Sequence, residues 1–205
     1  MIGVTVELGK DEIKNISQAL KGHAEAAERA IIRTRNDVVE RGMPKLTKHI
    51  SKTYNISRDD LTNGKQFSSE KSKNLIKAKK TNSIHQSPRI EARGSHLTLM
   101  RFVQENKPNK KGVVSKMVKV KVKKGRAKKM GKTTFINTDR NGNLQVFQRR
   151  SDSRKINKLL KTTSVAFMAN NENVKPQMQD DIKVLLDKRS AHYIKQELKK
   201  IKGVK

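Results

Sequence analysis

Two apolar stripes at helical spacing, one near each end of the chain, restrict the folds that this sequence can adopt. The first keeps one helix face apolar in steps of three, four and seven residues. Its members are Ile13, Ile16, Leu20, Ala24, Ala27, Ile31, Val38, Leu46 and Ile50. It predicts a long N-terminal helix from Lys10, with Gly22 and Pro44 as weak points and a break or kink near Gly42–Pro44.

The second stripe predicts a C-terminal helix whose basic residues gather in the last turns, where they complement the helix dipole. Pro176 suits its first turn, and Gly203 marks its end. The apolar members of this stripe are Val174, Met178, Ile182, Leu185, Leu186, Tyr193, Ile194, Leu198 and Ile201.

Between the stripes, apolar and polar residues alternate at the period of two that is typical of β-strands. The strand candidates are 2–8, 89–93, 96–100, 117–123 and 156–160. Asn141-Gly142 lies between two β-prone runs, 133–137 and 144–148, and predicts a tight hairpin turn. Ser57 is placed to cap a short helix at 58–63, and 65–87 is polar, which indicates a loop or an irregular edge strand.

This order of elements predicts an α+β fold: a small, mostly antiparallel sheet with a long N-terminal helix and a C-terminal helix packed on it. We expect one domain over residues 1–205. Its parts are an N-terminal strand and long helix at 1–56, a β-rich basic region at 88–162 and a C-terminal helix at 173–202.

Charge is the strongest indication of function. Lys and Arg number 48 against 19 Asp and Glu, which gives a net charge of +29, and the absence of Cys excludes a disulfide scaffold, Cys-ligated zinc and thiol catalysis. Such a chain attracts polyanions: nucleic acid, an acidic protein surface or an anionic membrane. No run approaches 18 apolar residues and the N-terminus lacks a basic, apolar leader, so we expect neither a membrane span nor a secretory signal.

The positive charge is concentrated from Lys107 to Lys132, where there are twelve Lys or Arg and no acid. The candidate residues for contact with nucleic acid or an acidic partner are Lys116, Lys119, Lys121, Lys123, Lys124, Arg126, Lys128, Lys129 and Lys132. Valines alternate with the first of these lysines on the strand, and 125–132 is expected to be a basic loop. Lysines contact phosphates without reading sequence. The competing interpretation is a lysine-rich edge that prevents sheet aggregation.

Aromatic residues are too few for a typical single-strand-binding module, since Phe135 and Phe147 are expected in the sheet core. Enzymatic signatures are also missing: we find no phosphate-binding loop, no GxGxxG and no histidine pair at metal-ligand spacing. Acid-x-Lys triplets begin at Glu12 and Glu197, but both lie on expected amphipathic helices, where a solvated charged face explains them. We therefore predict no enzyme, metal or cofactor.

Several strings along the chain resemble one family. They are ISQALKGHAEAAERAIIRTRNDV, YNISRDDL, PRIEARGSHLTLMRF, VKVKVKKGRAKKM, NGNLQVFQRR and KLLKTTSVAFMAN. In this order they resemble the prophage minor tail protein Z family of tailed bacteriophages, whose members are also described as tail completion proteins. The resemblance covers roughly Ile13 to Lys200, is poorest at 64–87, and rests on the order of the elements.

The resemblance implies a virion structural protein at the head-proximal end of the tail, the neck, which finishes the tail for joining to the head and helps to seat the genome end. It supplies no catalytic residues. It implies a homo-oligomeric ring, with sixfold symmetry suggested by the family setting, and assembly in the host cytoplasm. The expected partners are tail-tube, tail terminator and neck proteins, the tape-measure protein and the double-stranded DNA of the genome end, with no membrane.

The residues alone leave two other functions open. One is a free, non-specific nucleic-acid-binding protein, ribosomal or nucleoid-like, which rests on the same charge. The other is a DNA-processing enzyme that uses Glu12 or Glu197 with divalent metal ions.

Overall fold

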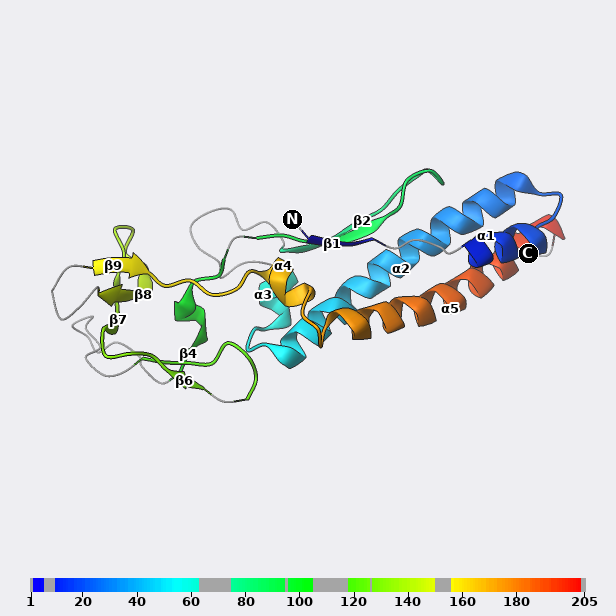
Figure 1. The fold of residues 1–205 in the computed structure, drawn as a ribbon. Helices are drawn as coiled ribbons and strands as arrows, with labels where there is room; N and C mark the ends of the chain where they lie inside the picture. Colours follow the sequence, from blue (N-terminus) through cyan, green and yellow to red (C-terminus); the bar gives the residue numbers. More distant parts are fainter. Residues whose placement is uncertain are drawn as a thin grey trace.

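A computed structural model describes residues 2–5, 10–62, 75–94, 96–104, 118–125, 127–149 and 156–203. The chain is elongated, with two long helices side by side at one end and a small β unit at the other (Figure 1). The fold class is confirmed as α+β, with small antiparallel sheets, a long N-terminal helix and a long C-terminal helix. Three small sheets take the place of the single sheet that the sequence suggested.

Long helices provide the rigid part of the molecule. The helices are α1 (Lys10–Ala19), α2 (Ala24–Thr53), α3 (Arg58–Thr62), α4 (Val165–Ala169), α5 (Lys175–Ile201) and the 3₁₀ helix η1 (Leu99–Phe102). Ser57 caps α3 as expected, since its Oγ accepts a hydrogen bond from the Asp60 backbone N–H at 3.1 Å. Pro176 lies in the first turn of α5, and Gly203 follows its end with φ +65°.

The expected break near Gly42–Pro44 is wrong. The helix is interrupted at Leu20–His23 instead, where Gly22 adopts φ +87°, a conformation that only glycine takes without strain. α2 continues through Pro44 because both neighbouring elements pack on this turn. A Cβ atom on Gly42 would lie 3.0 Å from Ile90 Cδ1 and 3.1 Å from Met178 Cε, so this glycine lets α2 approach β3 and α5 closely.

Nine short strands form three antiparallel sheets in the described part of the chain. They are β1 (Ile2–Thr5), β2 (Ile76–Lys79), β3 (Arg89–Ala92), β4 (Val103–Gln104), β5 (Lys119–Val120), β6 (Lys128–Lys129), β7 (Thr134–Thr138), β8 (Leu144–Arg149) and β9 (Ile156–Leu159). The strand orders are β1-β3-β2, β4-β5-β6 and β7-β8-β9. β2 lies within 65–87 and is an edge strand of its sheet. This agrees with one of the two expectations for that segment, an irregular edge strand.

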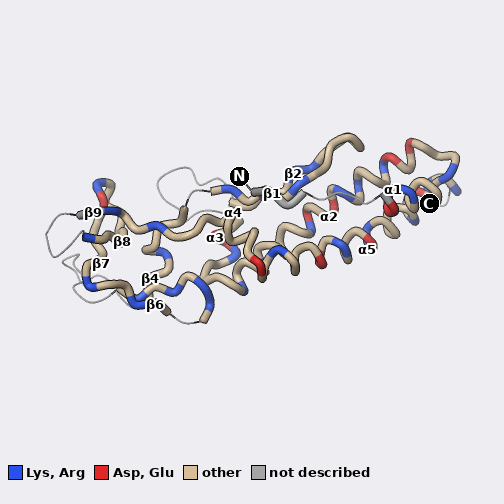
Figure 2. Tube along the Cα trace, in the orientation of Figure 1, with Lys and Arg blue, Asp and Glu red and all other residues tan. Residues whose placement is uncertain are grey.

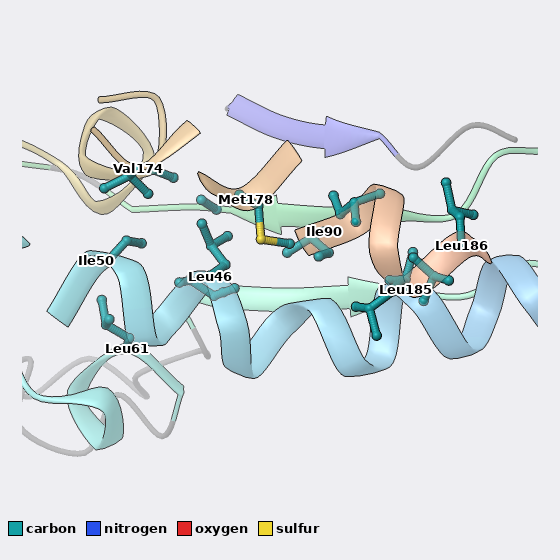
Figure 3. Close-up of a cluster of buried hydrophobic side chains, with 14 of the residues drawn as sticks. Leu46, Ile50, Leu61, Ile90, Val174, Met178, Leu185 and Leu186 are labelled. Atoms are coloured by element: carbon teal, nitrogen blue, oxygen red, sulfur yellow. The ribbon is translucent and has the colours of Figure 1, made fainter. Parts of the chain in front are cut away.

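The main core joins α2, α5 and the β1-β3-β2 sheet (Figure 3). Leu46 of the N-terminal stripe lies near Met178 of the C-terminal stripe and Ile90 of β3, while Ile50 lies towards Val174 and Leu185 packs further along α2. The expected apolar faces therefore pack against each other. Burial weakens towards the end of α5, where Ile201 is 37% exposed.

A second, smaller core lies between the other two sheets and consists of Leu99, Val118, Val120, Ile136 and Val146. The β7–β8 hairpin is confirmed, with Thr138 opposite Leu144. Its turn is wider than two residues: the Gly142 N–H donates to Asp139 O, the Asp139 N–H donates to Asn143 O, and Gly142 adopts φ +79°.

The sequence misassigned or missed three segments. The strand expected at 96–100 is wrong: Thr98 makes one isolated bridge to Lys161, and η1 follows, with Leu99 and Phe102 buried three residues apart as a 3₁₀ turn requires. The basic loop at 125–132 contains β6, which pairs with β5. α4, capped by Ser164 through the Phe167 N–H, was not expected. The prediction of one domain over 1–205 stays a prediction.

Candidate polyanion-binding surface

The described acids that lie deepest are paired with basic side chains inside the fold. Glu197 on α5 has a fully buried side chain, and Arg33 Nη1 and Lys200 Nζ lie 3.0 and 2.7 Å from its Oε1. Arg29 Nε lies 3.3 Å from Oε2. Burial opposes ionisation, but the hydrogen bonds from Lys200 and Arg29 leave the pKa of Glu197 below its ordinary value.

The same arrangement recurs along the α2–α5 interface. Asp181 accepts hydrogen bonds from Lys45 Nζ at 2.6 Å and lies 2.7 Å from His49 Nε2. Asp37 pairs with Arg41 on its own helix and with Arg189 on α5. Burial raises the pKa of each of these two carboxyl groups, but the neighbouring cations lower it by a larger amount. Both pKa values therefore lie below the ordinary value.

Glu91 on β3 shows the strongest electrostatic effect. Its side chain is 1% exposed and is surrounded by Lys79, Arg89 and Arg93. The hydrogen bond from Arg89, with those from Lys79 and Arg93, outweighs burial and lowers the pKa of Glu91 to about 2. These acids are therefore already paired with basic residues of the helices and of the β1-β3-β2 sheet, and they are not available to balance the charge of the β unit.

The β unit is cationic as a result. From Val118 to Arg149 there are ten Lys or Arg and one acid, whereas α2 and α5 each contain seven Lys or Arg and four acids. Figure 2 shows acidic positions spread along the helices, while basic positions dominate the opposite end. The one acid, Asp139, accepts hydrogen bonds from the backbone N–H groups of Asn141 and Asn143, which hold the hairpin turn.

The alternation expected for 117–123 is confirmed for Val118 to Val120, but the strand is shorter than expected: β5 contains only Lys119 and Val120, and Lys121 and Val122 are both half-buried. Val118 and Val120 are buried in the small core, whereas Lys119 is exposed. Lys119 lies directly opposite Lys129 in the β5–β6 pair, so the two side chains project from one face of the sheet.

Residues 122–124, which follow β5, are hydrogen-bonded through their backbone to the residues at the C-terminal end of α2. The Lys124 N–H donates to Thr53 O at 2.9 Å, the Asn55 N–H donates to Val122 O at 2.9 Å, and Lys123 bridges to Tyr54. Lysine charges beside the C-terminal end of a helix are favourable on their own. Lys123 and Lys124 can therefore stabilise the end of α2 and also contact an anionic partner.

The structure places only part of the predicted contact set on one sheet face: Lys119 and Lys129 share it, whereas Lys128 lies opposite the buried Val120 and projects from the other face. Lys123, Lys124, Lys128, Lys129 and Lys132 are exposed. In the described part of the chain, no ion-pair partner is found for these five or for Lys121. Lys116 and Arg126 lie outside the described residues.

Phe135 and Phe147 correct a sequence expectation. They were expected in the sheet core, but the core-facing residues of β7 and β8 are Ile136 and Val146. The two Phe residues lie opposite each other on the other face, half-buried, with ring centroids 6.0 Å apart. Alternation along the strands could have revealed this, since it places neighbours on opposite faces.

The two acid-x-Lys triplets lie in different surroundings. Glu197 is buried in the ion-pair network, which contradicts the expected solvated face, and Glu12 is half-buried on α1. Among the residues that the structure describes, no group of three or more His, Asp or Glu could hold a metal ion. No described helix is both long and apolar enough to cross a membrane.

The comparisons with known proteins identify one family. A search of curated proteins and a search of solved structures each found no match. The comparison with protein families matches residues 10–203 to the family described as prophage minor tail protein Z (GPZ). This match extends over nearly the whole chain, including both long helices and the β unit. The chain therefore belongs to the prophage minor tail protein Z family and is a structural protein of a phage tail.

Proposed function

We propose that this tail protein is a tail completion protein of the neck, at the head-proximal end of the tail. There it joins the tail to the head and contacts the genome end through the cationic β unit. The observation that carries the proposal is the lysine face of β5 and β6, where Lys119 lies opposite Lys129 and exposed lysines continue to Lys132.

The energetics of this face favour an anionic partner. Exposed lysines that lie close in the sequence repel one another, and in the described part of the chain no ion-pair partner is found for Lys123, Lys124, Lys128, Lys129 or Lys132. The internal acids already balance basic residues elsewhere, as the pairs of Glu197, Asp181 and Glu91 show. A phosphate backbone or an acidic rim placed against the face would relieve the repulsion.

Duplex DNA suits the chemistry of this surface. Lysine is a point charge that binds phosphate without the bidentate geometry used to recognise guanine. Contacts of this kind give affinity that does not depend on sequence. A protein that holds whichever duplex segment ends in the neck needs this property.

The proposed assembly is a homo-oligomeric ring, a hexamer in keeping with a tail, in contact with tail-tube, tail terminator and neck proteins. The tape-measure protein is a further candidate neighbour. A closed ring repeats the lysine face around one axis, which multiplies contacts to a central duplex.

The test compares two sixfold Lys→Gln variants of equal charge change in a prophage that lacks the gene. The first changes the β-unit lysines Lys121, Lys123, Lys124, Lys128, Lys129 and Lys132. The matched control changes exposed lysines on or next to α5, namely Lys175, Lys183, Lys188, Lys195, Lys199 and Lys202. Joined head–tail particles are counted by electron microscopy, and duplex binding is measured against salt concentration.

The β-unit variant should reduce joined particles at least about tenfold, and the salt slope of duplex binding should fall by about 0.9 for each phosphate-contacting lysine lost. The α5 variant should leave joining unchanged and alter the slope less. Equal effects of the two variants would show that total charge, and not this face, is responsible.

A further inference from the structure

The outer face of the β7-β8-β9 sheet presents a row of apolar side chains. Phe135 pairs with Phe147 across β7 and β8, and Phe147 pairs with Leu159 across β8 and β9. Cross-strand partners project from the same face, so the three side chains form one line across the sheet. All three are half-buried.

This row does not belong to either core. The small core uses the opposite face of the same strands, through Ile136 and Val146. Neither cluster of buried residues in the described chain includes Phe135, Phe147 or Leu159 among its members or its partly buried neighbours. Two of the five Phe residues of a chain with 3% aromatics are thus on a face that no described core uses.

Polar groups beside the row are unsatisfied. The guanidinium of Arg149, two residues after Phe147, lies over the Phe135 ring at 4.6 Å from its centroid. Arg149 Nε and Gln145 Oε1 are buried and have no hydrogen-bond partner among the described residues. Both residues alternate in step with Phe147, so they share its face.

We propose that this outer face, centred on Phe135, Phe147 and Leu159 with Arg149 beside them, docks a second tail protein that offers apolar side chains within an acidic rim. Aromatic side chains and arginine are the residues enriched at the centres of protein interfaces. Charge complementarity identifies the partner, since the β unit contains ten basic residues and one acid from Val118 to Arg149.

The same charge argues against the other occupants. A second copy would bring an equally cationic β unit against this one, and like charges at an interface oppose association. Duplex DNA has no apolar surface to cover the row. A single strand would need free ring faces, but Arg149 already covers Phe135, and Leu159 offers no stacking surface.

The two functions then lie on different faces of one small unit. The lysine face belongs to the β4-β5-β6 sheet and the aromatic face to the β7-β8-β9 sheet, while the shared core lies between them. The inference rests on the assignment to a tail but not on DNA contact, so each proposal can fail without the other.

The experiment places the photo-crosslinking residue benzoylphenylalanine at Phe147 in the full chain, in tails assembled after prophage induction. Its benzoyl group makes it larger than Phe, but Phe147 is half-buried, so the added group can extend away from the sheet, and circular dichroism checks that the variant is folded. Irradiation should join the chain to one other tail protein, identified by mass spectrometry. Benzoylphenylalanine at Lys183, an exposed position on α5, is the control and should not give the adduct to that same protein.

Adducts only to copies of this chain, only to nucleic acid, or to nothing would overturn the proposal. Arg149→Glu, made in the chain that carries benzoylphenylalanine at Phe147, tests whether the partner's rim is acidic. This substitution should reduce the yield of the adduct at least about tenfold, as expected for an interface anchor. An unchanged yield would contradict an acidic partner. The β-unit Lys→Gln variant, which tests DNA contact, leaves Arg149 and the aromatic row in place and should reduce the adduct less than Arg149→Glu does.

Discussion

At the scale of residues, the main finding is how acids and bases are distributed. Glu197 is fully buried between α2 and α5, with Arg29, Arg33 and Lys200 around it. Breaking a buried ion pair destabilises a protein because it leaves charges without compensation. The Glu197 carboxylate of the acid-x-Lys triplet therefore stabilises the pairing of α2 with α5.

Glu197→Gln should lower the free energy of unfolding by about 2 kcal/mol, since Arg29 and Arg33 remain partly hydrated and recover some of the loss. Glu25→Gln is the matched control: Glu25 pairs with the same Arg29 but is 91% exposed, and its loss should cost less than about 0.5 kcal/mol. Urea unfolding followed by circular dichroism measures both. Unchanged stability together with loss of a metal-dependent DNA cleavage would instead support the enzyme hypothesis.

Acid should destabilise the protein through Glu91. Its pKa is about 2 in the folded chain and about 4.5 without its neighbours, so between these values the unfolded chain binds more protons. The stabilisation is complete above about pH 4.5 and is lost as the pH falls towards 2. The lowered pKa values of Asp37, Asp181 and Glu197 act in the same direction.

Unfolding midpoints measured from pH 7 down to 2.5 should therefore fall most steeply below about 4.5. Glu91→Gln should flatten this dependence. A variant with the same slope as the original chain would show that the carboxylate of Glu91 does not contribute in this range.

At the scale of elements, α2 shows how tertiary packing overrides local preference. Pro44 lies inside a 30-residue helix, although proline in a helix interior removes a backbone hydrogen bond. Gly42, two residues before Pro44, is buried against Ile90 of β3 and Met178 of α5, and both of these side chains are fully buried. The helix continues because this turn is held from two sides.

Gly42→Ala should lower stability by about 1 kcal/mol, because crowding at 3.0 Å in a packed core outweighs the gain in helix propensity. Lys48→Ala, at an exposed position of the same helix, should change stability by less than about 0.5 kcal/mol. Thermal unfolding of both variants tests this. A stabilised Gly42→Ala variant would mean that Ile90 and Met178 can move aside.

The sequence predicted the elements whose pattern is local. The two apolar stripes, the Ser57 cap and the Asn141-Gly142 hairpin are all present, because each depends on neighbours a few residues away. The interruption falls at Gly22, one of the two weak points that the sequence marked, whereas α2 continues past Gly42 and Pro44 where it packs against β3 and α5, and periodicity does not report such contacts. The burial of Glu197 depended on Arg29 and Arg33, more than 160 residues away along the chain.

The same distinction applies to the candidate surface. Alternation of valine and lysine correctly placed Val118 and Val120 inside and Lys119 outside. It did not show that Lys128 and Lys129 form a strand beside Lys119, which requires knowledge of pairing. Hydrophobicity alone assigned Phe135 and Phe147 to the core, whereas the sheet has two faces and the core occupies the other one.

At the scale of the whole molecule, the elongated chain separates a helical body from a cationic β unit (Figure 1, Figure 2). Only 33% of the residues are hydrophobic, so the chain can bury little apolar surface in its own core. Contacts between subunits are therefore expected to add stability. In the proposed assembly the helical body makes the lateral contacts within the ring, and the β unit contacts DNA and a neighbouring tail protein.

The ring can be tested apart from its partners. Sedimentation of tail-derived complexes of this chain should give the mass of a hexamer of the 23.3-kDa chain. Its stability should depend on protein concentration, since subunit association is linked to folding. A monomer at all concentrations, with no association with tail proteins, would contradict the ring.

The most direct measurement is an electron cryo-microscopy structure of the intact particle at the junction of head and tail. The account predicts this chain at the neck, with Lys121, Lys123, Lys124, Lys128, Lys129 and Lys132 directed at the DNA of the genome end. A structure in which these side chains point into bulk solvent, away from DNA and from every acidic neighbour, would contradict the central claim.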